Sequence, residues 1–181
     1  MSTFFTSDLH FGHRSLDEHL RNIPTEECDN LIISNWNKIV HKQDLVYILG
    51  DITMEEPHRI EFFIKQLKGR IYVVGGNHDT RQCCSELNRL GIPVMGCIDY
   101  KGYTVTHIPV CEQELAFYRG NIHGHIHTFS RSMLPIDKYY NVNTEFHNYK
   151  PINFEEIEES FQNAKLAINS LKKLEQDEEN L

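Results

Sequence analysis

The sequence has no long run of apolar residues, and none approaches the ~18 residues that a membrane-spanning helix needs. Its first residues lack the basic segment and apolar stretch of a secretory signal peptide, so we expect a cytoplasmic location. Positive charge is also scarce, with 18 lysines and arginines against 26 acidic residues and a formal net charge of −8. A broad basic surface for long nucleic acid is therefore not expected.

Cysteines occur without the CxxC spacing of many zinc sites, and their number, five, is odd. This pattern favours free thiols in a reducing compartment over a disulfide framework. Histidine, in contrast, is frequent: there are 11, and three of them fall within residues 123–127.

The length of 181 residues favours a single domain, which we expect over residues 1–175 with an acidic, frayed tail at 176–181. Strands and helices alternate in the first half, whereas the second half reads as mostly antiparallel. The predicted class is α/β, a two-sheet core flanked by helices. Predicted strands cover residues 3–7, 45–49, 71–74, 98–107 (as a hairpin), 121–127 and, as the last strand, 139–143; predicted helices cover 24–40, 57–69, 80–90 and 154–174.

Polar side chains follow several of these strands at the point where each strand ends. The clearest case is Val73-Val74-Gly75-Gly76, which runs directly into Asn77-His78-Asp79. Open α/β sheets place their ligands at the carboxyl ends of strands. The same position is held by Asp8, His10, Asp51, His107, His125 and His127.

Imidazoles mixed with carboxylates suit Mn, Fe, Zn or Ni rather than calcium. Residues two apart in a strand point the same way, so Asp8 and His10, or His125 and His127, would hold one ion together. Seven ligands are too many for one tetrahedral ion but enough for two ions that share a carboxylate. Two such ions ~3.5–4 Å apart clamp a phosphoryl group and activate a shared water. We expect two divalent cations, Mn²⁺ first, with Fe, Zn or Ni as alternatives.

Each residue taken alone also has a structural interpretation. Aspartate is a common helix cap, so Asp8 could have that role. Asparagine is common in left-handed turns, so Asn77 could be a turn residue, and His107 could be a hydrogen-bonded strand histidine. His125 and His127 could belong to a structural zinc site, although that needs about four nearby cysteine or histidine ligands.

Together the blocks resemble the signature of the calcineurin-like metallophosphoesterases. Asp8-x-His10, Gly50-Asp51, Gly76-Asn77-His78-Asp79, His107 and Gly124-His125-x-His127 occur in the order of that family. The segments 8–13 and 148–152 further resemble a compact bacterial or phage branch without a large cap. The resemblance implies a β-sandwich flanked by helices and a phosphomonoesterase or phosphodiesterase.

The resemblance also implies how the ligands are divided between two cations. His78 belongs to neither set, and would protonate the leaving oxygen as general acid while a hydroxide bridging the metals attacks phosphorus. Many relatives of this branch carry an aspartate near the last strand, where this chain has Asn143-Thr144-Glu145. The implied ligands are Asp8, His10, His127 and bridging Asp51 for one ion, and Asp51, Asn77, His107 and His125 for the other.

Substrate contacts are expected from Asn77 and His78, and from His13 and Arg81, which could equally be solvated surface residues. The expected partner is a small phosphorylated molecule, a nucleotide among the candidates; the sequence leaves the oligomeric state open. A different class of function is a metal- or nucleotide-binding module with vestigial turnover. A hydrolase of another fold that uses a single metal is a third alternative.

Overall fold

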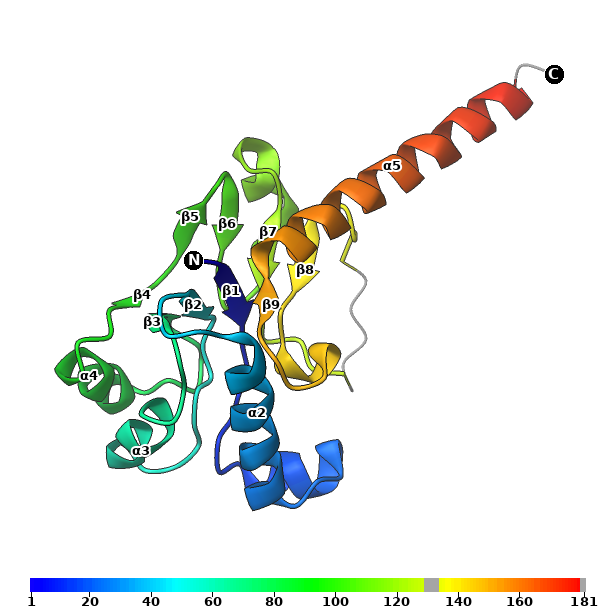
Figure 1. Cartoon of the computed structure of the whole chain (residues 1–181). Helices are drawn as coiled ribbons and strands as arrows, with labels where there is room; N and C mark the ends of the chain where they lie inside the picture. The colour runs from blue at the N-terminus through cyan, green and yellow to red at the C-terminus, as the bar shows by residue number, and fades with distance from the viewer. Residues whose placement is uncertain (129–133, 180–181) are drawn as a thin grey trace.

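The computed structural model describes residues 1–128 and 134–179. Within these residues the strands form two sheets, of five and four strands, with the order β4-β3-β2-β1-β9 in the first and β5-β6-β7-β8 in the second (Figure 1). The first sheet contains β1 (Thr3–Thr6), β2 (Leu45–Ile48), β3 (Arg70–Val74), β4 (Val94–Met95) and β9 (Ile152–Asn153); the second contains β5 (Ile98–Tyr100), β6 (Tyr103–Val105), β7 (Asn121–His123) and β8 (Tyr139–Asn141).

Helices cover the outer face of the first sheet. In α2 (Thr25–Ile39), Cys28, Ile32 and Trp36 recur every four residues and are buried against that sheet. This cluster of buried side chains also takes in residues of α3 and α4. The other helical segments are α1 (Arg14–Leu16), η1 (Asp17–Arg21), η2 (Pro57–Arg59), α3 (Ile60–Ile64), α4 (Arg81–Arg89), η3 (Glu112–Phe117), η4 (Thr144–His147) and α5 (Phe154–Glu179).

A second core lies between the two sheets. Phe5 of β1 and Val105 of β6 belong to it, and α5 adds Phe154 and Phe161 from its first turns. Beyond these turns α5 projects from the body of the protein (Figure 1). It reaches Glu179, so it includes most of the segment expected as a tail; residues 180–181 of that segment lie outside the described residues. None of the helices described here combines the length and the apolar character of a membrane span.

The second sheet departs from the sequence prediction. The hairpin between β5 and β6 is present, but β6 pairs with β7, and β7 with β8, in parallel. The expectation of a mostly antiparallel second half is therefore wrong. Residues 106–120 and 124–138 are long enough for the crossovers that parallel neighbours require. β8 is also not the last strand, because β9 follows it and pairs antiparallel with β1.

The two sheets are joined just beyond β1. Ser7 forms a parallel bridge with Asn143, and its amide donates to the carbonyl of Val142 (3.1 Å). The chain therefore leaves the first sheet and pairs with the second within one residue. This junction brings the segments that follow β1, β2, β3, β6 and β7 to one edge of the molecule.

Candidate metal centre

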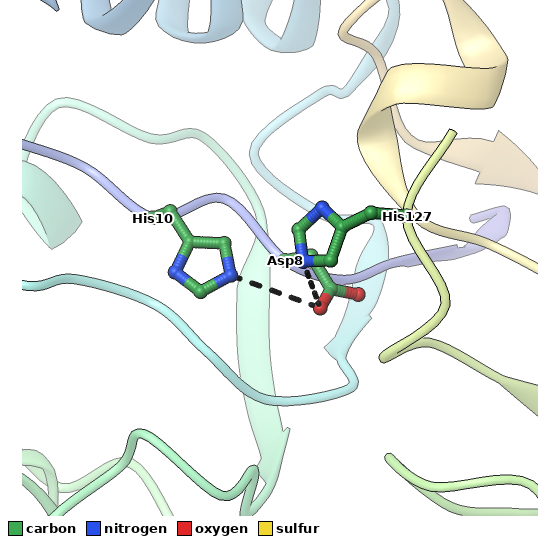
Figure 2. A group of neighbouring side chains, drawn as sticks. All are labelled: Asp8, His10 and His127. Carbon is green, nitrogen blue, oxygen red and sulfur yellow. Dashed lines mark ion pairs between the residues drawn. The ribbon is translucent and has the colours of Figure 1, made fainter. Parts of the chain in front are cut away.

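Three of the predicted ligands meet at this edge. Asp8 Oδ1 lies 3.9 Å from His10 Nε2 and 3.6 Å from His127 Nε2 (Figure 2). One ligand atom from each residue lies within 4.8 Å of the others, which is close enough for one cation. Asp8 and His10 are buried, so a cation here would be largely removed from water.

Asp51 lies between this group and a second one. Its Oδ2 is 3.6 Å from His10 Nε2 and 3.4 Å from His107 Nε2. Asp8, Asp51 and His107 also bring ligand atoms within 4.8 Å of one another. A carboxylate that faces a histidine of each group is what a bridging ligand requires.

Hydrogen bonds on the far side of two rings determine which nitrogen faces the centre. His107 Nδ1 lies 2.6 Å from the carbonyl of Leu49, which can only accept, so Nδ1 carries a proton. His127 Nδ1 lies 2.8 Å from Glu145 Oε1 and donates to it in the same way. Both rings therefore turn Nε2 toward the carboxylates, as metal-ligating histidines do.

Burial dominates the electrostatics of the first group. It raises the pKa of Asp8 and lowers the pKa of His10 to about 3, which keeps this imidazole neutral. Burial would also raise the pKa of Asp51, but the hydrogen bond and charge of His107 bring it below its usual value. Burial of His107 would lower the pKa of its ring, but the hydrogen bond and charge of the Asp51 carboxylate raise it above the ordinary value. The second group thus favours a positive charge among its oxygens.

These donors fit divalent cations. Asp8 Oδ1 and both ring nitrogens of His10 are buried and have no hydrogen-bond partner among the described residues. Buried polar groups without partners are uncommon in folded proteins, and a bound ion is one explanation for them. Neutral imidazoles and carboxylates are ligands of Mn, Fe, Zn and Ni.

Several candidate ligands lie in loops with left-handed backbone, and not in the strands that the sequence had suggested. Asp8, His10 and His125 have positive φ angles of 56°, 50° and 68°, and β1 and β7 end before them. The expectation that residues two apart in a strand share a face is therefore wrong for both pairs, because neither pair is in a strand. Gly124 is required by close approach, because a Cβ there would collide with Ser7 Oγ and Asp8 Oδ2.

The other two predicted ligands are exposed and flank His107. Asn77 Oδ1 lies 2.8 Å from His107 Nε2, and the ring of His125 is 5.1 Å from the His107 ring between centroids. The amide of His125 donates to Asp8 Oδ2 (2.9 Å). Both side chains are placed at the second group, and their role as ligands stays a prediction.

His78 is exposed beside the first group, with its ring centroid 5.5 Å from that of His10. Its backbone amide donates to Asp51 Oδ1 (2.9 Å). His13 also packs against His10, at 5.5 Å between centroids, but its Nδ1 accepts from the amide of Leu16 (3.4 Å). Arg81 is exposed at the first residue of α4. The catalytic role of His78 and the substrate contacts remain predictions.

Two residues with buried side chains, to which the sequence assigned no role, support the first group. Arg21 Nη2 donates to the carbonyl of Asp8 (2.8 Å), and its Nε donates to Glu145 Oε1 (3.1 Å). Burial would raise the pKa of Glu145, but the hydrogen bonds from His127 and Thr128 lower it to about 2. Glu145 belongs to the segment Asn143-Thr144-Glu145, where many relatives of the compact branch carry an aspartate, so the sequence offered a signal for it. Arg21 belongs to no motif.

Asp79 and His123 have structural roles. Asp79 accepts from the backbone amides of Asp51 (2.9 Å), Gly76 (2.8 Å) and Ile52 (3.1 Å), so its carboxylate holds the loops after β2 and β3 together. His123 is buried, and its Nδ1 bonds to the carbonyl of Gly124 (2.8 Å).

Comparison with known proteins identifies the family. Residues 1–170 match the calcineurin-like phosphoesterase family. The chain belongs to the calcineurin-like phosphoesterases. This membership confirms the resemblance drawn from the sequence, and the two mixed sheets flanked by helices agree with the fold of the family.

Several relatives of this phosphoesterase have related sequences or folds. An uncharacterized protein of Methanocaldococcus jannaschii is 31% identical, over 93% of this chain and 97% of its own length. The gene 66 protein of Mycobacterium phage L5 is 42% identical over 84 residues, which are 43% of this chain and 40% of the phage protein. A crystal structure of a protein of unknown function from Aquifex aeolicus superposes with a TM-score of 0.71 and 26% identity, covering 87% of this chain and 98% of that one.

Family membership supports a hydrolase that binds metal and acts on phosphoesters, and the family typically binds two divalent cations. The two groups of carboxylates and histidines described above are candidates for those cations.

Proposed function

We propose that this protein hydrolyses phosphomonoesters or phosphodiesters of small molecules, nucleotides among them, with two divalent cations held at the candidate metal centre. The single observation that carries this proposal is the position of Asp51. Its carboxylate faces His10 at 3.6 Å and His107 at 3.4 Å, and so can belong to both cation sites.

Asp8, His10, His127 and Asp51 would hold one cation, and Asp51, Asn77, His107 and His125 the other. When bound, such a pair neutralises phosphoryl oxygens and makes a shared water more acidic. His78 stands outside both sets with an exposed ring, so it is available to give a proton to the leaving oxygen. Its backbone amide donates to Asp51 Oδ1, which keeps His78 next to the carboxylate that would bridge the cations.

The experiment combines metal counting with two test esters. Protein stripped with a chelator is reloaded with Mn²⁺, its bound metal is measured, and hydrolysis of p-nitrophenyl phosphate and bis(p-nitrophenyl) phosphate is followed. We expect turnover that rises with metal content up to two ions per chain. His19→Gln, which replaces an exposed histidine of η1, is the control and should behave as the wild type. A protein that takes up two ions and hydrolyses neither ester would instead be a binding module.

A further inference from the structure

A cavity of about 370 Å³ lies beside His78, between the loop that follows β2 and the beginning of α4. Its volume falls within the ~300–1,000 Å³ of typical small-molecule sites. Met54, Glu55 and Glu56 line it on one side, and Thr80 and Gln82 on the other. Because His78 belongs to the lining, the cavity begins at the side chain that would meet the leaving oxygen.

The wall that carries the two glutamates is fixed to the loop that follows β1. The amide of Met54 and the hydroxyl of Thr53 both donate to the carbonyl of Phe11, at 3.1 Å and 2.8 Å. The amide of Glu55 donates to Thr53 Oγ1 (3.0 Å). This side of the cavity is thus held by hydrogen bonds within the protein, which need no ligand.

The opposite wall is fixed by the capping of α4 and by Asp79. Thr80 Oγ1 accepts from the amide of Cys83 (3.3 Å), which caps the helix. Through its bonds to the amides of Asp51 and Ile52, Asp79 connects this wall to the loop after β2. The cavity is therefore preformed, which lowers the entropy cost of binding.

Charge sets what this cavity can accept. The described residues that line it include two glutamates and neither lysine nor arginine. Both glutamates are exposed. A second phosphate placed here would face like charge, whereas hydroxyl and amino groups would find carboxylate acceptors. Met54, 43% exposed, adds a polarizable apolar surface suited to a ring.

We propose that the cavity holds the alcohol half of the phosphoester, and that Glu55 and Glu56 select nucleoside-like leaving groups without a second phosphate. The inference rests on the proposed function, because it assumes that His78 faces the leaving oxygen. In the reaction, the oxygen of water bonds to phosphorus and the bond between phosphorus and the alcohol oxygen breaks. The alcohol oxygen takes a proton from His78, and the attacking water gives up a proton that restores the protonated His78.

The test compares leaving groups that differ only in a second phosphate. For monoesterase activity the pair is adenosine 5′-phosphate and adenosine 3′,5′-bisphosphate, followed as loss of the 5′-phosphate by chromatography. For diesterase activity the pair is ApA and ApAp, in which the leaving adenosine lacks or carries a 3′-phosphate. We expect kcat/KM to be about tenfold or more higher for the member without the second phosphate.

A double variant identifies the residues responsible. Glu55→Gln combined with Glu56→Gln should raise kcat/KM for the doubly phosphorylated member and bring the ratio close to one, with metal content unchanged. Glu155→Gln combined with Glu159→Gln, an equal change of charge at exposed positions of α5, should leave the ratio as in the wild type. Thermal unfolding of each variant checks that it is folded.

Two outcomes would overturn the proposal, and they differ from failure of the proposed function. Equal kcat/KM for both members in the wild type, or a ratio that the double variant does not change, would reject the leaving-group cavity while hydrolysis itself stands. Absence of turnover on both p-nitrophenyl esters by protein loaded with two metals would reject the proposed function, and the cavity proposal with it.

Discussion

Glu145 Oε1 lies 2.8 Å from Nδ1 of His127 and 3.1 Å from Nε of Arg21. One carboxylate oxygen therefore holds the ring of a candidate metal ligand and the guanidinium that bonds to the carbonyl of Asp8. These contacts connect the loop after β7 with the loop after β1 through side chains that are almost fully buried. The first candidate cation site would depend on this connection, because its candidate ligands come from both loops.

Replacing Glu145 by glutamine should weaken the binding of one cation. The substitution keeps the size of the side chain but removes the charge that favours the Nδ1–H form of His127. Mutation of such an outer hydrogen-bond partner typically lowers metal affinity by about 10–100-fold. Titration of metal-free protein with Mn²⁺ by calorimetry measures the effect. Glu112→Gln, which breaks an exposed ion pair with Lys138, is the matched control. Unchanged affinity at both sites would contradict the role assigned to Glu145.

Asp51→Asn should reduce the occupancy of both cation sites. The change keeps the shape of the side chain and removes the negative charge that faces both His10 and His107. Metal analysis after gel filtration should find well under one ion per chain, and ester hydrolysis should be lost with it. If one ion stayed bound with the affinity of the wild type, Asp51 would not be a bridging ligand.

His78→Ala should keep both cations and slow the hydrolysis of esters with poor leaving groups by about 10²–10⁴-fold, because the proposed general acid is lost. The backbone amide that bonds to Asp51 is still present in alanine, so the metal centre should not be disturbed. Esters of p-nitrophenol, which leaves without a proton, should be affected far less. Rates for alkyl and p-nitrophenyl esters, measured with metal content, provide the comparison. Equal slowing of both kinds of ester would argue against a general acid.

Asp44 offers a prediction about stability away from the metal centre. Its two oxygens accept from the amides of Ser2 (2.8 Å) and His41 (2.9 Å), and these bonds hold its pKa below the ordinary value of 3.8. Asp44→Asn should lower the free energy of unfolding by about 1–3 kcal/mol at neutral pH.

The pH dependence of that difference follows from the depressed pKa. The carboxylate contributes its full stabilisation above pH 3.8, and the contribution is lost as pH falls through the lower pKa of the folded state. Urea unfolding of metal-free wild type and variant should therefore differ at pH 7 and converge in strong acid. A difference that stays constant with pH would mean that the charge of Asp44 is not responsible.

Much of the fold follows from local pattern. Runs of β-branched and aromatic residues predict β1, β2 and β3, and the helical spacing of Leu31, Ile32, Trp36 and Ile39 predicts α2. The parallel pairing of β6 with β7 and of β7 with β8 could not be predicted in this way. Whether neighbouring strands run parallel or antiparallel depends on the path of the chain between them, here residues 106–120 and 124–138. Strand sequence carries little information about that choice.

The sequence by itself determined the family of this protein, its α/β class and the polar residues at strand ends, because these are properties of short segments in a fixed order. Only the tertiary structure decided that Arg21 and Glu145, 124 residues apart, support Asp8 and His127, and that a cavity lined by Glu55 and Glu56 lies beside His78. The physical reason is that burial, left-handed backbone at Asp8 and His10, and unpartnered ligand atoms arise from contacts between distant segments. Such contacts form only when the two sheets meet at the junction of Ser7 and Asn143.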